Sequence, residues 1–322
     1  MSLPLVSVIC LCYNHEKYVA ATLASVWAQS YAHLEVVIVD DASQDQSVAS
    51  IRKFLADNPA DFPVKTIFLE ENLGNCTAFN RGWKLTKGKY VIDLATDDVM
   101  SSDRIAKQVT YFERLPDDYG VLFTESQYID EQGIPLYFHF KNQYRHIRPI
   151  PTGDVYQDVL SKYFISSPTM MVKGEVLQAL NGYDESLAYE DFDLWVRSAR
   201  QYKYAYLDEC TTWVRKLSSS MSSQLYEKND RQLESTFLVC QKAEKLNKTH
   251  EEQQALGRRI RYEARHALLA GKFEETRKFL SLLKHLGLRY HDTLLLEILL
   301  LLRVNLSVPY RWFLTLRSVS KR

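Results

Sequence analysis

Short apolar runs alternate with polar and amphipathic stretches along the first hundred residues of the chain. Runs rich in Val, Ile and Leu occupy residues 5–11, 34–39, 64–69 and 90–94, and each has the length of a buried strand. The stretches between them, residues 18–27, 47–55 and 72–85, are predicted helices. Strands that alternate with helices predict an α/β fold, with a mostly parallel sheet and helices on both of its faces.

The pattern changes from about residue 227 onward, where Leu recurs at helical spacing and Gly is rare. Residues 266–285 resemble a helical hairpin around Gly271, and the Ser-rich residues 218–223 mark the change in composition. We therefore predict two domains, residues 1–222 and a helical domain of residues 223–322. The second is expected to be an acceptor platform, a dimer contact or an attachment to a membrane surface. Residues 293–302 are strongly apolar but too few to span a bilayer.

The formal net charge of zero conceals an asymmetry between the two parts of the chain. Residues 227–322 contain 19 Lys and Arg against 11 Asp and Glu, and the preceding residues contain 21 against 29. An acidic first part suits a metal site. A basic second part can face an anionic surface, although a solvated helical face is the simpler explanation.

The cysteines and the N-terminus indicate a cytoplasmic protein. Five scattered cysteines without C-x-x-C spacing indicate neither a zinc site nor a redox centre, and they suit a reducing compartment. The first residues lead straight into an apolar strand, without the basic region of a signal peptide. Peripheral attachment at the inner face of the plasma membrane is the open alternative.

Two pairs of acids directly follow predicted strands, where open α/β sheets bind their ligands. Asp40 and Asp41 follow the second strand, and a carboxylate there can accept a hydrogen bond from the imide N–H of uracil or thymine. A turn and helix cap formed by Asp40 or Ser43 is the alternative. Asp97 and Asp98 follow the fourth strand, where hard oxygen ligands suit Mg²⁺ or Mn²⁺ held between the protein and a diphosphate.

A third acidic group, Glu190 and Asp191, precedes an apolar-periodic stretch that is expected to begin a helix. Acids are favoured at helix N-termini by the helix dipole, so capping alone can explain them. The functional alternative is a general base that takes a proton from an acceptor hydroxyl.

The order and spacing of these three acidic groups resemble the inverting glycosyltransferases of family 2, which have a Rossmann-like GT-A fold. The resemblance covers roughly residues 5–217, and a C-terminal α-helical region follows it. The motifs that carry it are Val6-Ser7-Val8-Ile9 with Tyr13-Asn14 and residues 34–45, then Asn72-Leu73-Gly74-Asn75, Asn80-Arg81-Gly82 and Gly88-Lys89-Tyr90, and last Gly182-Tyr183-Asp184-Glu185 before Glu190-Asp191.

The resemblance implies a hexosyltransferase that uses Mn²⁺ or Mg²⁺ to transfer a single sugar from a nucleotide-diphosphate sugar. UDP-sugar is the expected donor, with dTDP- and GDP-sugars as alternatives, and the expected acceptor is a glycan or lipid-linked hydroxyl in bacterial surface polysaccharide synthesis. The implied roles are catalytic base for Asp191 with Glu190 beside it, metal ligand for Asp98, ribose contact for Asp97, base contacts for Asp41 assisted by Asp40, stacking for Tyr13, and further nucleotide contacts for Asn14 and Asn80.

The chain departs from the family pattern at three positions. Ala95 replaces the first carboxylate of a frequent Asp-x-Asp-Asp motif, Phe79 stands where a basic residue is frequent, and Leu217 lies near a position where many relatives have His. His139 and His146 are the candidates to replace that histidine. The Gln-x-x-Arg-Trp motif of processive synthases is missing, because Arg311-Trp312 is preceded by Val308.

Other classes of protein fit the sequence less well. A dinucleotide-binding dehydrogenase needs a glycine-rich turn after the first strand, and residues 11–16 contain no glycine. Nucleic-acid binding is not indicated, since the aromatic residues of the basic part lie at helical spacing. Two alternatives stay open: a sugar nucleotidyltransferase, and a non-catalytic GT-A-fold module that binds a sugar or a partner.

Overall fold

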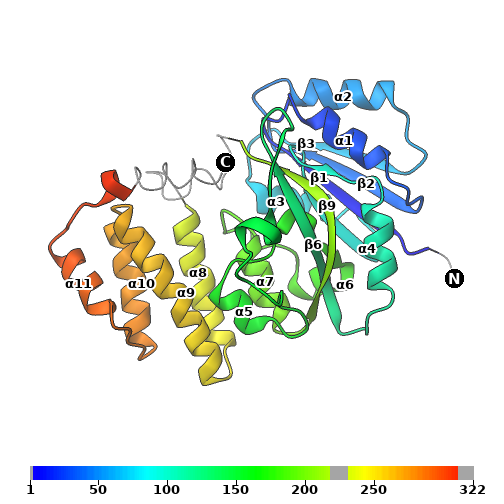
Figure 1. Cartoon of the computed structure of the whole chain (residues 1–322). Helices are drawn as coiled ribbons and strands as arrows, with labels where there is room; N and C mark the ends of the chain where they lie inside the picture. The colour runs from blue at the N-terminus through cyan, green and yellow to red at the C-terminus, as the bar shows by residue number, and fades with distance from the viewer. Residues whose placement is uncertain (1–2, 218–230, 311–322) are drawn as a thin grey trace. The chain divides into compact units, whose positions relative to one another are not determined.

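A computed structural model of the chain describes residues 3–217 and 231–310 (Figure 1). The chain divides into two compact units: the first holds the residues up to Val155 and Phe164–Leu217, and the second holds Tyr156–Tyr163 and the chain after Leu217. The predicted domain boundary at residues 222 and 223 lies outside the described residues, as does Arg311-Trp312, and the boundary stays a prediction. No sequence pattern indicated that the helix α5 (Tyr156–Ser161) belongs with the second unit.

The first unit is built on a nine-stranded sheet with the order β3-β2-β1-β4-β8-β6-β9-β5, and β7 pairs with β6. The four predicted strands form its parallel half, with β1 between β2 and β4. Beyond them β8 is antiparallel to both β4 and β6, and β6 pairs in parallel with β9, so the sheet contains both kinds of pairing. In chain order the strands are β1 (Val6–Cys12), β2 (Leu34–Asp40), β3 (Val64–Phe68), β4 (Tyr90–Ala95), β5 (Val99–Met100), β6 (Tyr119–Ile129), β7 (Pro135–Phe138), β8 (Met171–Lys173) and β9 (Lys203–Arg215).

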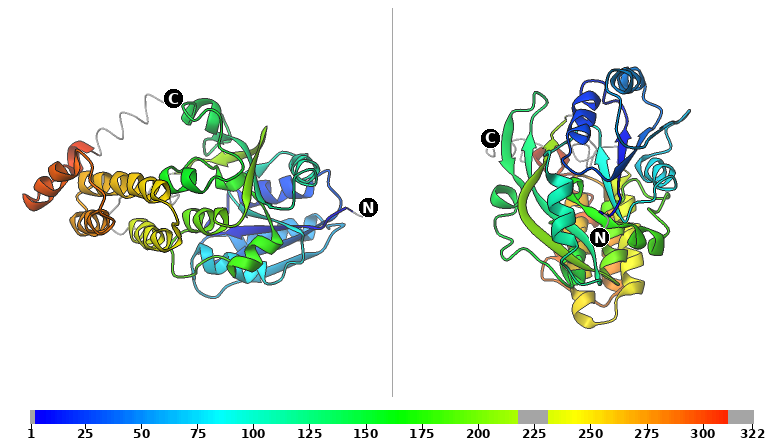
Figure 2. Two further views of the ribbon diagram at one scale, coloured as in Figure 1. Left: turned by 90° about the horizontal axis from the view of Figure 1, so that it is seen from below. Right: turned by 90° about the vertical axis from the view of Figure 1, so that its right-hand side faces the viewer.

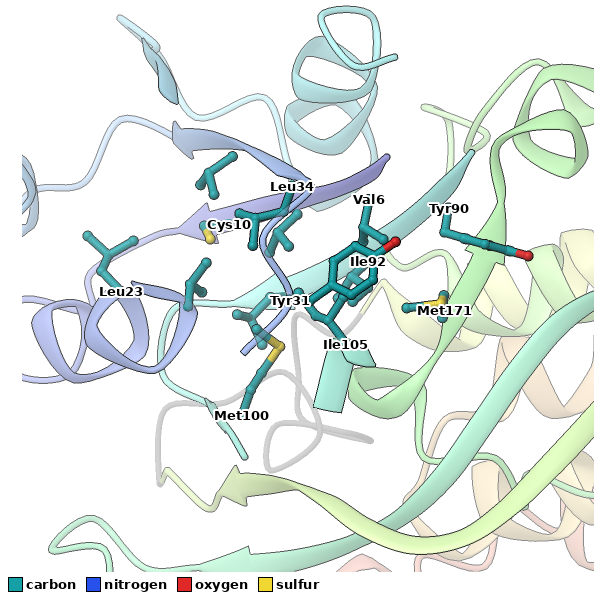
Figure 3. Packing of buried hydrophobic residues seen from close by; sticks show 14 of the residues in the cluster. Val6, Cys10, Leu23, Tyr31, Leu34, Tyr90, Ile92, Met100, Ile105 and Met171 are labelled. Atoms are coloured by element: carbon teal, nitrogen blue, oxygen red, sulfur yellow. The ribbon is translucent and has the colours of Figure 1, made fainter. Parts of the chain in front are cut away.

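Helices cover both faces of the parallel half, as predicted. One face packs against α1 (Val19–Trp27), α2 (Ser47–Asp57) and α4 (Arg104–Phe112), and α3 (Asn75–Trp83) lies on the other. A Cβ at Gly82 of α3 would come within 2.9 Å of the side chains of Ile9 and Val39, so α3 approaches the sheet closely only because this residue is glycine. Figure 3 shows the core on the first face, where side chains from the strands meet Leu23 of α1 and Ile105 of α4.

Three short helices follow the parallel half of the sheet in the first unit. They are the π-helix η1 (His139–Gln143), the 3₁₀ turn η2 (Ser167–Thr169) and α6 (Gly174–Leu180), and α7 (Asp191–Ala199) follows them along the chain. The N-terminus of α7 carries the third acidic group.

Within the described residues, the second unit consists of helices (Figure 2). After α5 they are α8 (Gln232–Leu246), α9 (His250–Leu269), α10 (Phe273–His285) and α11 (Thr293–Leu301). A capping box formed by Thr249 and Glu252 begins α9. The predicted helical hairpin is confirmed: α9 and α10 pack together and are joined through Gly271, whose φ of 78° suits glycine. None of the helices in the described part of the chain is long and apolar enough to cross a membrane.

Candidate active site

The strands β1, β2 and β4 end side by side, because the register pairs Cys12 with Asp40 and Leu11 with Ala95. Parallel strands bring their carboxyl ends to one edge of the sheet, which is where ligands of α/β proteins bind. This edge therefore gathers the residues that the sequence analysis placed after the strands: Tyr13 and Asn14, Asp40 and Asp41, and Asp97 and Asp98.

Asn14 ties the loops after β1 and β2 together. Its N–H donates to Ser43 Oγ at 2.9 Å, and its Oδ1 accepts from the N–H of Gln44 at 2.7 Å. Its backbone is left-handed, with a φ of 59°, a conformation that Asn tolerates. Asn14 thus fixes the two loops that follow β1 and β2 at this edge of the sheet, and its nucleotide contact stays a prediction. The neighbouring Tyr13 is 43% exposed, so its ring is open for stacking.

Asp40 closes the turn after β2. The N–H and the hydroxyl of Ser43 donate to its two carboxylate oxygens at 2.9 and 2.6 Å, and the side chain is fully buried. These contacts form the turn that the sequence suggested as the alternative to a nucleobase contact. Its assistance to Asp41 stays a prediction.

Asp41 holds the loop that precedes α3. Its Oδ1 and Oδ2 accept hydrogen bonds from the N–H groups of Leu73 and Gly74, at 2.7 and 2.9 Å. Burial raises the pKa of Asp41, and these two hydrogen bonds oppose the rise. Each carboxylate oxygen has a second lone pair, so Asp41 can still accept a hydrogen bond from a ligand.

Asp98 is backed by two arginines. The N–H of Arg215 donates to Asp98 Oδ1 at 2.8 Å, and Arg215 Nε donates to the carbonyl of Asp97 at 2.9 Å. Arg104 is fully buried and donates to Thr212 Oγ1 and to the carbonyl of Met170. Burial and the neighbouring Asp97 raise the pKa of Asp98, and the charges of Arg104 and Arg215 oppose that rise.

The surroundings of Asp98 fit a divalent cation that is shared with a substrate. In residues 3–217 and 231–310 no group of three or more His, Cys, Asp or Glu side chains is placed to hold a metal. Mg²⁺ and Mn²⁺ need no such cage when one carboxylate and the phosphates of a substrate complete their coordination. Of the two carboxylate oxygens of Asp98, only Oδ1 accepts a hydrogen bond from the described residues, which leaves Oδ2 for a cation.

The structure gives His139 a structural role. The Nδ1 of His139 lies 2.9 Å from the hydroxyl of Tyr128 and its Nε2 lies 2.7 Å from the carbonyl of Phe164, so both nitrogens are engaged. Burial lowers the pKa of His139 to about 4. His146 lies exposed beside the ring of Tyr144.

A histidine that sequence reasoning did not single out lies at the strand ends. Nδ1 of His15 is 2.9 Å from Thr96 Oγ1 and 4.0 Å from a carboxylate oxygen of Asp97. It occupies the loop after β1, where only Tyr13 and Asn14 were considered.

Glu190 and Asp191 lie at the N-terminus of α7, as the N-cap and the first helical residue. The side-chain amide of Asn75 donates a hydrogen bond to Glu190, and the buried Oδ1 of Asp191 has no hydrogen-bond partner among the described residues. Burial together with the charges of Asp191 and Asp93 raises the pKa of Glu190. Burial also raises the pKa of Asp191, but hydrogen bonds from Ser167 and Glu190 oppose it. Because adjacent carboxyls do not both ionise readily, this pair tends to share a proton.

Asn80 is engaged within the protein. Its side chain donates to the carbonyl of Tyr183 at 2.8 Å and to Glu185 Oε1 at 2.9 Å, and it accepts from the N–H of Tyr183 at 2.9 Å. Phe79 stacks on the ring of Tyr183, with 3.9 Å between the ring centroids. Asn80 and Phe79 therefore hold the loop that leads to α7, and a nucleotide contact from Asn80 stays a prediction.

Three further residues escaped the sequence analysis as site residues. Arg104 and Arg215 lie in stretches that carry no motif, so nothing in the sequence connects them to Asp98. Asp93 carried a signal, because it is an acid inside the apolar run of residues 90–94.

Comparison with known proteins identifies the family and the fold. Residues 7–174 match the family model "Glycosyl transferase family 2". The chain is 27% identical over 245 residues to TuaG of Bacillus subtilis (strain 168), a glycosyltransferase named for teichuronic acid biosynthesis. The alignment covers 76% of this chain and 90% of TuaG. It is 30% identical over 212 residues to MJ1057 of Methanocaldococcus jannaschii, an uncharacterized glycosyltransferase, which covers 65% of this chain and 70% of that protein.

Solved structures share the fold. The S. aureus TarS 1–349 structure in complex with UDP-GlcNAc has a TM-score of 0.66 and 20% identity, over 87% of this chain and 80% of that one. The mannosyltransferase PcManGT of Pyrobaculum calidifontis, in complex with GDP-Man and Mn²⁺, has a TM-score of 0.64 and 17% identity, over 99% of this chain and 85% of that one. The predicted GT-A fold with added C-terminal helices is confirmed.

Proposed function

Because the chain belongs to glycosyl transferase family 2, we propose that it is an inverting, metal-dependent hexosyltransferase that transfers a single sugar from a UDP-sugar to a hydroxyl group. The observation that carries the proposal is the carboxylate of Asp191. Its Oδ1 is buried and has no hydrogen-bond partner among the described residues. The charge of Asp191 also acts on Asp93 of β4, the strand that leads to Asp98. The proposed catalytic base, Asp191, thus interacts with the strand that leads to the proposed metal ligand, Asp98.

The proposed chemistry uses the difference between the two carboxyls of α7. Glu190 keeps its proton and accepts a hydrogen bond from Asn75, while Asp191 takes the proton of the acceptor hydroxyl. The hydroxyl oxygen forms the new bond to the anomeric carbon as the bond from that carbon to the diphosphate breaks on the opposite side. Attack from the opposite side inverts the anomeric centre, without a covalent sugar–enzyme intermediate.

The donor would lie at the edge of the sheet near Asp97 and Asp98, the acids that Arg104 and Arg215 support. We assign the metal to Asp98, the ribose to Asp97, and the base to Asp41 and Tyr13. When bound, Mn²⁺ or Mg²⁺ neutralises charge on the departing diphosphate. The complexes of TarS with UDP-GlcNAc and of PcManGT with GDP-Man and Mn²⁺ support a nucleotide-sugar donor and a divalent metal, through the shared fold.

The acceptor we propose is a hydroxyl of a glycan or lipid-linked sugar in bacterial surface polysaccharide synthesis. The support is the relative TuaG, which is named for teichuronic acid biosynthesis and is matched over 90% of its length. The names of the relatives are those of glycosyltransferases, which favours transfer over nucleotidyl transfer or a non-catalytic module.

The test of this proposal is nucleotide release by the full chain with UDP-GlcNAc, dTDP-glucose and GDP-mannose in the presence of Mn²⁺. Replacing Asp191→Asn should lower turnover by at least about a hundredfold and leave donor binding intact, because a general base contributes about that much. Asp184→Asn is the matched control, since this nearby carboxylate accepts hydrogen bonds from the N–H and the hydroxyl of Ser186. Unchanged turnover in Asp191→Asn would refute the assignment of the base.

For the second unit we propose attachment to an anionic membrane surface through α11. One side of this helix exposes a stripe of apolar side chains at helical spacing: Leu294 66%, Leu295 55%, Ile298 45%, Leu301 83% and Leu302 67%. Residues 231–322 contain 18 Lys and Arg against 9 Asp and Glu, which complements anionic lipid headgroups. A helix of nine residues is only about 14 Å long. It is small for a dimer interface, which takes about 20–30 residues from each side.

Vesicle sedimentation tests this attachment. The full chain should sediment with vesicles that contain phosphatidylglycerol and much less with pure phosphatidylcholine. The double variant Leu301→Ser/Leu302→Ser should lose the binding, and Leu238→Ser, an exposed leucine of α8, should keep it. A chain that binds neither vesicle, or that elutes as a dimer which the double variant dissociates, would contradict the proposal.

A further inference from the structure

Three consecutive residues, Leu73, Gly74 and Asn75, contact both the acid assigned to the nucleobase and an acid at the start of α7. The N–H groups of Leu73 and Gly74 donate to the two carboxylate oxygens of Asp41, at 2.7 and 2.9 Å. The side-chain amide of Asn75 donates to Oε2 of Glu190. Hydrogen bonds therefore join Asp41 to Glu190 through these three residues, which we call the strap.

The strap has a backbone conformation that depends on its glycine. Gly74 has a φ of 86° and a ψ of 158°, a region that only glycine adopts readily, and it is the N-cap of α3. Its carbonyl accepts from the N–H of Ala78 at 3.0 Å. Asn75 is the first residue of α3, and this helix lies close against the sheet at Gly82. The strap is therefore fixed to Asp41 at its start and to α3 at its end.

The contact between Asn75 and Glu190 is separate from the packing that holds α3 against the loop before α7. The side chain of Asn80 donates to the carbonyl of Tyr183 at 2.8 Å and accepts from its N–H at 2.9 Å, and Phe79 stacks on the Tyr183 ring. None of these contacts involves the strap. Removal of the Asn75 amide should therefore leave α3 and this loop in place, so that its effect falls on Glu190.

We infer that the strap is a positioning element for the proposed base, and that Asn75 orients the Glu190 carboxyl beside that base. The inference rests on the proposed function, in which Asp191 is the base and Asp41 contacts the nucleobase. Because Oε2 of Glu190 accepts from Asn75, and a protonated carboxyl donates from one oxygen only, a proton on Glu190 belongs on Oε1. The hydrogen bond from Glu190 to Asp191 then has one direction, which leaves Oδ1 of Asp191 for the acceptor hydroxyl.

The first test is UDP release by the full chain from UDP-GlcNAc with Mn²⁺. Asn75→Ala should lower kcat about tenfold, the effect of about one hydrogen bond, and should leave the KM for the donor within about twofold. Asn75→Asp should lower kcat further, because it places a third carboxylate beside the acids of α7 in place of a donor. If Asn75 served only to begin α3, Asn75→Asp would be the milder change, since an acid suits the first turn of a helix.

A double-mutant cycle tests whether the strap joins its two ends. Asp41→Ala should weaken donor binding and should also lower kcat at saturating donor, since Leu73 and Gly74 lose their acceptor. In the Asn75→Ala background, Asp41→Ala should lower kcat by clearly less, because the strap no longer reaches Glu190. Effects of the two substitutions on kcat that simply multiply would overturn the inference.

Amide hydrogen exchange is a readout that does not need activity. The N–H groups of Leu73 and Gly74 should be protected in the parent by their hydrogen bonds to Asp41. Asn75→Ala should speed their exchange by about tenfold, because the strap loses one of its hydrogen bonds. If the parent releases no nucleotide, the proposed function fails. Unchanged exchange at Leu73 and Gly74 in Asn75→Ala overturns the inference whether or not the parent is active.

Asn58→Ala is the matched control, because it also removes one hydrogen bond of an Asn side chain at a helix end. The side-chain amide of Asn58, the C-cap of α2, donates to the carbonyl of Phe54 at 2.9 Å. This substitution should change neither kcat nor the exchange of the strap. The inference is overturned if Asn58→Ala lowers kcat as much as Asn75→Ala does, if Asn75→Ala leaves kcat unchanged, or if Asn75→Asp is more active than Asn75→Ala.

Discussion

Two groups of acids belong to the candidate site, and they differ in the charged groups that surround them. Behind the arginine-backed acids, Asp97 and Asp98, the backbone N–H of Arg215 donates to the Asp98 carboxylate and the Arg215 guanidinium donates to the backbone carbonyl of Asp97. The charge of the buried Arg104 acts on Asp98. The arginine-free acids, Asp93, Glu190 and Asp191, have no arginine among the groups that shift their pKa values. Their hydrogen bonds come from neutral side chains, such as those of Asn75 and Tyr183.

The difference bears on the chemistry proposed for each group, because the arginine charges oppose the rise in the pKa of Asp98 that burial and Asp97 cause. A carboxylate that binds a cation has to stay negative, and positive charge behind it favours the ionised form. A carboxyl that exchanges protons needs the opposite setting, in which like charges bring its pKa towards the working pH. Under the proposed function, the arginines would support the carboxylate that binds the metal, and their absence from the surroundings of Asp191 would suit proton exchange.

The largest effect is expected from Arg104→Met, which removes the fully buried guanidinium. Its hydrogen bonds to Thr212 and Met170 are lost and Asp98 loses an opposing charge, so the free energy of unfolding should fall by about 3–5 kcal/mol. Urea denaturation measures this. Lys107→Met, an exposed residue paired with Asp103 one turn along α4, should cost less than about 1 kcal/mol. Equal losses of stability in the two variants would mean that the buried Arg104 contributes no more than an exposed ion pair, and would contradict its proposed support of Asp98.

A smaller effect is expected on the pH dependence of stability. The folded chain keeps a proton on Asp93 up to about pH 7, whereas the unfolded chain releases it near the ordinary value for Asp. The unfolding free energy therefore falls as pH rises through this window, by at most about 1.4 kcal/mol per pH unit for one proton. Asp93→Asn should flatten this decline in urea titrations made at several pH values. Parallel curves for the parent and Asp93→Asn would mean that Asp93 is ionised throughout.

The smallest effect is expected from Tyr13→Ala, which removes the exposed ring at the proposed donor site. Stacking of this kind contributes about 0.5–1.5 kcal/mol, so donor affinity should fall by about 2- to 13-fold. Calorimetric titration with UDP measures it. An infrared titration of the protonated carboxyl groups of Asp93, Glu190 and Asp191 should not change, and a change there would show that these acids and the donor site are not independent.

The parallel half of the sheet could be predicted from the sequence because buried parallel strands are nearly continuous apolar runs. The acids at their ends followed directly from that prediction. The strands β6 and β9 were not predicted, since they contain polar residues such as Glu125 and Thr212 within the strand. The part of the sheet beyond β4, which combines antiparallel pairs with the parallel pair of β6 and β9, therefore escaped the pattern analysis.

Partners from distant segments set the state of each acid, and no local pattern identifies them. Asn75 lies 115 residues from Glu190, and Arg215 lies 117 residues from Asp98. For Asp40 the local alternative describes its contacts, because a turn needs only Ser43, three residues away. The sequence could name the acids, but the fold was needed to show which of them are compensated.

Thermal stability of the parent and of Asp98→Ala, with UDP-, dTDP- and GDP-sugars and with Mn²⁺, Mg²⁺ or a chelator, tests the central claim most directly. A ligand that binds only the folded chain raises Tm, by an amount equivalent to about 2.7 kcal/mol at a hundred times Kd. The parent should show a rise with UDP-sugar that needs the metal, and Asp98→Ala should not. An equal rise with metal and with chelator, or an unchanged metal-dependent rise in Asp98→Ala, would contradict the assignment of the donor site.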